Sequence, residues 1–168
     1  MSLNEIIDAT SVAVAADPVN AAVLFAVDGS LTTGVATTVR VRGHHIDVDE
    51  PPTLGGADAA ANPVEYALAA LISCQVVTYR FWAAKLSIQL DGISIRAEGD
   101  LDVRGFFGLD AEVRPGFGAV RLAVTLEGPE TAERYRELRA AVDRHCPVLD
   151  LFANPTPVSV ELHVGAPA

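Results

Sequence analysis

Hydrophobic and polar positions change their spacing several times along the chain, and each change predicts a different element. Residues 3–16 repeat apolar positions at helical spacing, and Ser2 and Glu5 stand where a capping box begins a helix. Residues 21–50 alternate apolar and polar side chains instead, which predicts two or three antiparallel strands with a hairpin turn at Asp28-Gly29.

The most apolar segment, residues 63–85, predicts a long helix. Asn62 suits the N-cap, Pro63 suits the first helical position, and Glu65 can reach back to the N-cap amide. Apolar side chains cover nearly all faces of this helix, so it must be enclosed on most sides: Tyr66, Leu68, Leu71, Ile72, Val76, Val77, Phe81 and Trp82. One small sheet cannot enclose it, and we expect a homodimer that packs two such helices between sheets.

The second half of the chain returns to strand alternation. Residues 86–105 and 119–128 predict strands, and 129–145 predicts an amphipathic helix with apolar positions three and four apart. Pro147 ends that helix and opens a short one, and a last strand is predicted over 156–164. This order predicts an α+β fold with antiparallel sheets around a long buried helix.

Composition and charge narrow the class of protein. The chain has 168 residues, half of them apolar, which fits a single domain over 1–168 with an additional helix within 1–18. A net charge of −10 and the absence of a basic run argue against a nucleic-acid partner. The amino terminus lacks the basic residues of a secretory signal, so we expect a cytoplasmic location. Gln75 and Arg80 interrupt the apolar stretch 66–84 and favour a buried helix over a membrane span.

Two cysteines carry the candidate chemistry. Cys146 directly precedes Pro147, at the amino terminus of a helix, where unpaired backbone amides stabilise a thiolate. Cys74 lies inside the apolar helix, where burial raises the thiol pKa and makes the group inert unless a cation is held beside it. The pattern alone leaves three interpretations open: unreactive core cysteines, a redox pair and a metal site.

Histidine positions add little to these interpretations. None of the four histidines has the spacing of a metal site, and His145, beside Cys146, is interpreted as a surface residue: His44, His45, His145 and His163. We therefore expect no metal and no cofactor.

Several motifs in this order resemble the OsmC/Ohr family of thiol-dependent organic hydroperoxide reductases. A cysteine follows the Asn62-Pro63 pair at position 74, and His145-Cys146-Pro147 stands at a later helix break. The stretches "DEPPTLGGADAAANP", "EGDLDVRG" and "RPGFGAVRL" belong to the same resemblance, which runs from about residue 35 to 164.

The resemblance implies an OsmC-like fold, an intertwined homodimer and a peroxidase activity. Cys74 would attack an alkyl or fatty-acid hydroperoxide, and Cys146 would resolve the resulting sulfenic acid to a disulfide. A dithiol such as a lipoyl protein would then reduce the disulfide. These implications describe a stress-response antioxidant protein without a nucleic-acid or membrane partner.

Family peroxidases also use a glutamate and an arginine to hold the reactive cysteine as a thiolate. The glutamate position is Val64 in this chain, and Glu65 is the neighbouring candidate. Arg40 and Arg42, on one predicted strand, are candidates for the arginine, and Arg80 is a further candidate cation. The second hypothesis is a non-enzymatic module that binds a small ligand and keeps both cysteines as structural residues.

Overall fold

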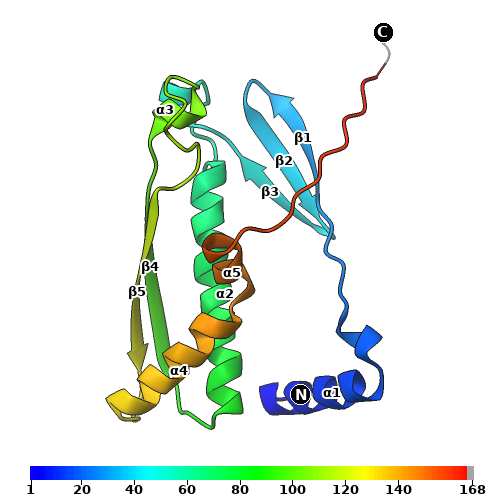
Figure 1. The fold of residues 1–168 in the computed structure, drawn as a ribbon, viewed down its shortest axis with the longest axis vertical. Coiled ribbons are helices and arrows are strands. Elements are labelled where there is room, and N and C mark those ends of the chain that lie inside the picture. The colour runs from blue at the N-terminus through cyan, green and yellow to red at the C-terminus, as the bar shows by residue number, and fades with distance from the viewer. Residues whose placement is uncertain (166–168) are drawn as a thin grey trace.

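The structure is a computed structural model that describes residues 1–165, and its two sheets lie on different sides of one long helix (Figure 1). The helix is α2 (Pro63–Lys85). The first sheet has the order β1-β2-β3, and the second pairs β4 with β5, all antiparallel. Their bounds are β1 (Asp28–Thr33), β2 (Ala36–Val41), β3 (His44–Val48), β4 (Gly92–Asp100) and β5 (Ala119–Glu127).

Helix α2 begins as its sequence predicts. The Asn62 side chain accepts a hydrogen bond from the Glu65 amide, and Glu65 accepts one from the Asn62 amide, both at 2.9 Å. The Asp49 carboxylate, 3% exposed, fixes the preceding loop by accepting the amides of Ala57 and Ala59 at 3.0 and 3.1 Å. These bonds hold the pKa of Asp49 below its usual range, and they set where the chain enters α2.

The first sheet corrects one predicted turn. Asp28 and Gly29 lie at the start of β1, paired with Arg40 and Val39, and not at a hairpin turn. The chain reverses instead at Gly34, whose φ of 56° is the left-handed conformation that a glycine adopts without strain. The turn at Gly34 therefore sets which residues of β1 and β2 pair with each other.

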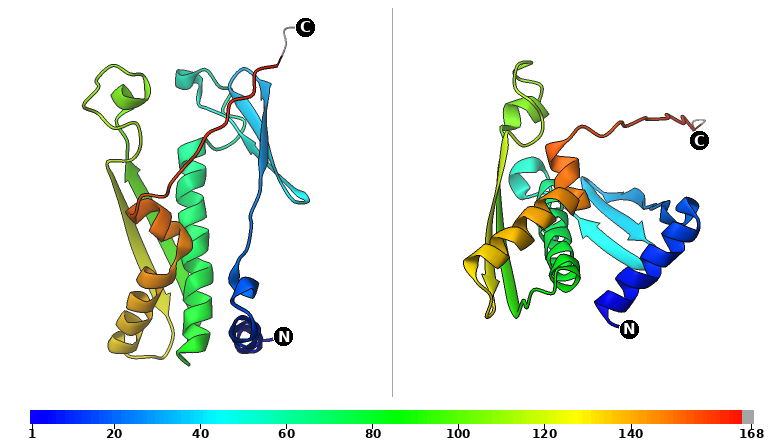
Figure 2. Two further views of the ribbon diagram at one scale, coloured as in Figure 1. Left: turned by 45° about the vertical axis from the view of Figure 1, so that its right-hand side comes forward. Right: turned by 60° about the horizontal axis from the view of Figure 1, so that its bottom comes forward.

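The second sheet covers α2 together with two helices. Along β5 the apolar side chains at every second position are half-buried, and the alternate positions are exposed. The amphipathic helix α4 (Ala132–His145) and the short α5 (Pro147–Ala153) pack against α2, as Figure 2 shows from two sides. The buried core is one cluster from α2, α4 and the segment between α2 and β4: Tyr79, Ala83, Ile88, Leu90, Leu138, Val142 and Cys146.

Helix α2 is enclosed on one face only by the chain described. Its buried residues are Leu71, Gln75, Thr78, Tyr79 and Ala83. Val77, on the other face, is 55% exposed. The predicted enclosure of this helix on most sides is therefore not found within the one subunit described.

The predicted last strand does not form within the described chain. Residues 156–164 have no strand assignment, and the segment runs from α5 away from β4 and β5 (Figure 1). Its four apolar side chains are 82–88% exposed: Val158, Val160, Leu162 and Val164. An alternating segment forms a strand only where a sheet edge supplies hydrogen-bond partners. Among residues 1–165, no such edge lies along it.

At the amino terminus, α1 (Leu3–Ala16) confirms the predicted first helix and its capping box of Ser2 and Glu5. It lies near the carboxyl end of α2, on the side away from β4 and β5 (Figures 1 and 2). By length and composition α2 alone, among the described helices, could cross a membrane. Core helices of globular proteins meet the same criterion, and the contacts of α2 with β4, α4 and α5 are those of a core helix.

We expect Leu138→Ala to lower the free energy of unfolding by about 2–5 kcal/mol, because Leu138 is 0% exposed and truncation leaves a cavity in the core. Urea unfolding of the variant measures this change. Leu109→Ala is the matched control, since Leu109 is 73% exposed and its loss should change stability by less than about 0.5 kcal/mol. Equal effects of the two substitutions would contradict the assigned core.

Candidate active site

The two cysteines meet where α2 passes the break between α4 and α5. Cys74, half-buried, packs against the core cluster that contains Cys146, which is 2% exposed. Both thiols are free, and the Cys146 side chain lies near enough to the Cys74 thiol to raise its pKa. The fold therefore brings together two residues that are 72 positions apart in the sequence.

The helix break fixes the position of Cys146. Its amide donates to the Val142 carbonyl at 3.0 Å as the C-cap of α4, and its own carbonyl accepts the Asp150 amide at 3.1 Å as the N-cap of α5. Pro147 stands at the first position of α5, where its missing N–H removes no helical hydrogen bond. The break at Cys146-Pro147 confirms the sequence prediction.

Burial governs the electrostatics of Cys74. Desolvation raises the pKa of the Cys74 thiol, the backbone amide of Val148 opposes that shift, and the Cys146 side chain adds to it. No arginine contributes to this pKa within the described chain. Within one subunit, Cys74 is therefore a thiol at neutral pH.

The other predicted site residues lie elsewhere. Glu65 is occupied in the capping box of α2, the role that its spacing from Asn62 also predicted. Arg40 lies on β2 opposite Asp28 and His45, and Arg42 lies in the turn after β2 with φ of 55°. Both arginines are exposed, and neither forms an ion pair with a residue in 1–165. The subunit brings none of these three to Cys74.

Arg80 and His145 have structural contacts of their own. Arg80 Nη1 donates to the Leu90 carbonyl at 2.7 Å, which ties α2 to the start of β4. His145 is exposed but stacks on Trp82 with 4.1 Å between ring centroids, and its Nδ1 lies 2.7 Å from the Ala141 carbonyl. Neither group acts on the thiols in this arrangement.

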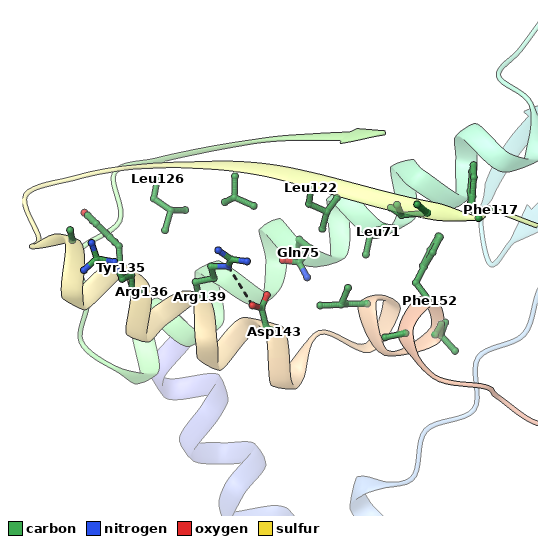
Figure 3. A pocket seen from close by; sticks show the side chains of 18 of the residues that line it. Leu71, Gln75, Phe117, Leu122, Leu126, Tyr135, Arg136, Arg139, Asp143 and Phe152 are labelled. Carbon is green, nitrogen blue, oxygen red and sulfur yellow. Dashed lines mark ion pairs between the residues drawn. The ribbon is translucent and has the colours of Figure 1, made fainter. Parts of the chain in front are cut away.

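A groove that the sequence did not predict lies beside this site, with a volume of about 960 Å³ (Figure 3). The groove runs between β5 on one side and α4 and α5 on the other, with Leu71 and Gln75 of α2 at its floor. Neither cysteine lines it, although Cys74 and Gln75 are sequence neighbours. Gln75, a polar residue within an apolar helix, was the one feature of the sequence that could have indicated this groove.

Metal binding has no support in the described residues. Within 1–165, no group of three or more histidine, cysteine, aspartate or glutamate side chains is arranged to hold an ion.

The family assignment follows from residues 55–161, which match the model of the OsmC-like protein family. The chain belongs to the OsmC-like family. The match includes α2, β4, β5, α4 and α5, and thus both cysteines. The resemblance inferred from the sequence motifs is confirmed, and so is the OsmC-like α+β fold.

Solved structures share this fold at low sequence identity. An OsmC-like protein from Mycoplasma pneumoniae superposes with a TM-score of 0.68 at 15% identity, covering 78% of this chain and 88% of that one. An organic hydroperoxide resistance protein OsmC from Legionella pneumophila gives 0.61 at 22% identity, with coverages of 78% and 91%. An organic hydroperoxide resistance protein from Elizabethkingia anophelis gives 0.59 at 22% identity, with coverages of 77% and 89%. No curated protein matches the chain.

The raised pKa of Cys74 predicts how its reactivity depends on pH. Alkylation by iodoacetamide requires the thiolate, so its rate at Cys74 should rise about tenfold per pH unit from pH 7 to about pH 9 without levelling off. Mass mapping of the Cys74 peptide against time measures the rate, with glutathione as the reference thiol. A plateau below about pH 8 would contradict the shift and would require a cation beside Cys74.

The same shift has a consequence for stability. A folded-state pKa above the unfolded value means that unfolded Cys74 loses its proton first as pH rises. The protonated Cys74 thiol therefore contributes fully to the stability of the folded state at neutral pH, and this contribution is lost as pH rises through the folded-state pKa.

Proposed function

We propose that this chain is a thiol-dependent peroxidase that reduces organic hydroperoxides. The observation that carries the proposal is that Cys74 on α2 packs against the core cluster that contains Cys146, at the α4–α5 break. Membership of the OsmC-like family supports it, as do the names of the Legionella and Elizabethkingia proteins of the same fold. We place the protein in the cytoplasm as a single domain.

The proposed reaction has three balanced steps. The Cys74 thiolate attacks the outer oxygen of ROOH, the O–O bond breaks, and the alkoxide takes a proton to leave as ROH, with Cys74 oxidised to a sulfenic acid. The Cys146 sulfur then attacks that sulfenic sulfur, a disulfide forms, and water leaves. An external dithiol, such as a lipoyl protein, reduces the disulfide to two thiols and becomes a disulfide itself. Burial of Cys146 near Cys74 favours fast resolution over further oxidation.

Activation of Cys74 requires a cation that its own subunit does not place there. We assign this role to Arg40 or Arg42 of a second copy, because both side chains are exposed and without a carboxylate partner among residues 1–165. A guanidinium within about 4–6 Å would lower the thiol pKa by one to three units and offset the effect of burial. Glu65 could then act by orienting that arginine, in addition to capping α2.

A homodimer is part of this proposal. Residues 158–164 present apolar side chains on alternate positions to solvent, and Leu24 and Phe25 are 92% and 84% exposed in the extended stretch before β1. Within the described chain, β4 and β5 pair only with each other, so each has a free edge. A second copy would cover the open face of α2 and supply a partner for the unpaired segment.

We expect Val160→Asp to weaken the dimer on the order of 100-fold or more, because a carboxylate would be buried without a partner at the new interface. Sedimentation velocity across a concentration series measures the dissociation constant. Ser159→Asp is the matched control, since Ser159 is a polar position of the alternating segment and would face away from Val160 once the segment joins a sheet. A monomeric wild type, or equal weakening by both variants, would contradict this interface.

For the activity, one equivalent of cumene hydroperoxide should remove both thiols of the wild type and produce an intramolecular disulfide. Cys146→Ser should stop at a Cys74 sulfenic acid, trapped by dimedone, and Cys74→Ser should keep its remaining thiol. Intact mass and free-thiol counts follow each step, and hydrogen peroxide should react more slowly. Survival of both thiols would overturn the peroxidase.

That outcome would favour the second candidate, a non-enzymatic module that binds a small ligand in the same fold. Two observations favour this alternative: Val64 stands at the glutamate position of the resembled peroxidases, and the raised pKa of Cys74 keeps it protonated. The alkylation profile and the thiol count together separate the two candidates.

A further inference from the structure

The groove beside the thiol site is amphipathic in a way that indicates a ligand. One wall is the apolar face of β5, contributed by Leu122, Val124 and Leu126. Phe117 and Phe152 lie at one end, with 6.4 Å between ring centroids. Figure 3 shows the polar side chains of Gln75, Arg139 and Asp143 gathered at the middle of the groove. Apolar walls with a few convergent polar groups are typical of small-molecule sites.

Gln75 provides an independent observation. Its side chain is 1% exposed, and its Nε2 has no hydrogen-bond partner within residues 1–165. A buried amide donor without an acceptor costs free energy, so such groups call for a specific explanation. Because the last torsion of glutamine is broad and roughly two-fold, a half-turn about it exchanges the amide oxygen and nitrogen, so either atom can face the groove.

Four charged side chains line the groove, Arg114, Arg136, Arg139 and Asp143, and those at its middle favour an uncharged head group beside Gln75. At its middle, Arg139 Nε lies 3.4 Å from Asp143 Oδ2, so these two groups neutralise each other. Arg136 forms an ion pair with Glu133 at 2.8 Å. Both side chains are more than 70% exposed, so water screens their charges and they contribute little to binding an ion in the groove. An anionic head group next to Gln75 would also approach Asp143. A hydroxyl avoids that repulsion, since it can accept from the amide and donate to the carboxylate.

We propose that this groove binds a single-chain aliphatic alcohol, with the alkyl chain along β5 and the hydroxyl between Gln75 and Asp143. The site lies within one subunit and involves neither cysteine, so it does not rest on the peroxidase chemistry. Its proposed role is binding, without any covalent step.

Displacement of the neutral fluorescent probe N-phenyl-1-naphthylamine from the full-length protein tests the site. The expected order is 1-decanol ahead of decanoate by about tenfold or more in Kd, because decanoate loses the donated hydrogen bond and meets Asp143. Tighter binding of decanoate would overturn the uncharged head group. Absence of probe or alcohol binding would overturn the site and would indicate that a second copy fills the groove.

Gln75→Leu separates a ligand role from a structural one. It should weaken 1-decanol binding by about tenfold while raising the melting temperature of the free protein, since it removes an unpartnered buried amide. Gln89→Leu makes the same chemical change at an exposed position outside the groove and should alter neither 1-decanol binding nor the probe. Unchanged 1-decanol binding in Gln75→Leu would overturn the assignment.

Two further variants keep the test decisive. Leu122→Trp places a large side chain on the β5 wall and should abolish binding of both the probe and the alcohol. It replaces Gln75→Leu as the test if that variant does not fold. The double variant Cys74→Ser and Cys146→Ser should bind 1-decanol like the wild type. If the double variant binds 1-decanol while the wild type consumes no peroxide, the alcohol site is supported and the proposed peroxidase activity is overturned. If the double variant loses binding, the site is not independent of the thiols and the proposal fails.

Discussion

Burial of one face of α2 is the constraint on which the rest of this structure depends. The helix carries apolar side chains on nearly all sides, and a single chain covers only the face containing Leu71, Thr78 and Tyr79. The sheet of β4 and β5, together with α4 and α5, exists in this arrangement because each contributes side chains to that face. The remaining face, with Val77 half in solvent, is left uncovered by the described chain.

The two thiols are a result of this packing. Cys74 is near the buried face of α2, and the core that encloses it also contains Cys146. The same burial that brings the sulfurs together suppresses ionisation of Cys74. Proximity and reactivity therefore conflict within one subunit, and a cation from outside it would be needed to satisfy both.

Local sequence signals predicted local structure well. Asn62, Pro63 and Glu65 marked the start of α2, and Cys146-Pro147 marked the break between α4 and α5, because capping and proline geometry depend only on near neighbours. The turn signal at Asp28-Gly29 was wrong, since pairing along β1 and β2 favoured reversal at Gly34. Residues 156–164 have the alternation of a strand, but strand formation depends on an edge that sequence cannot locate. Non-local features were likewise missed. To predict that Gln75 lies at the floor of a groove, one must know which helices and strands meet there.

The double cap at Cys146 has a further consequence. Its amide ends one helix and its carbonyl begins the next, so two backbone hydrogen bonds fix the residue that carries the sulfur. Pro147 maintains that division, because a proline cannot donate the hydrogen bond that would fuse the two helices. The position of Cys146 relative to Cys74 thus depends on Pro147, the residue that directly follows Cys146. A substitution at Pro147 would therefore alter the spacing of the two sulfurs while both cysteines stay in the sequence.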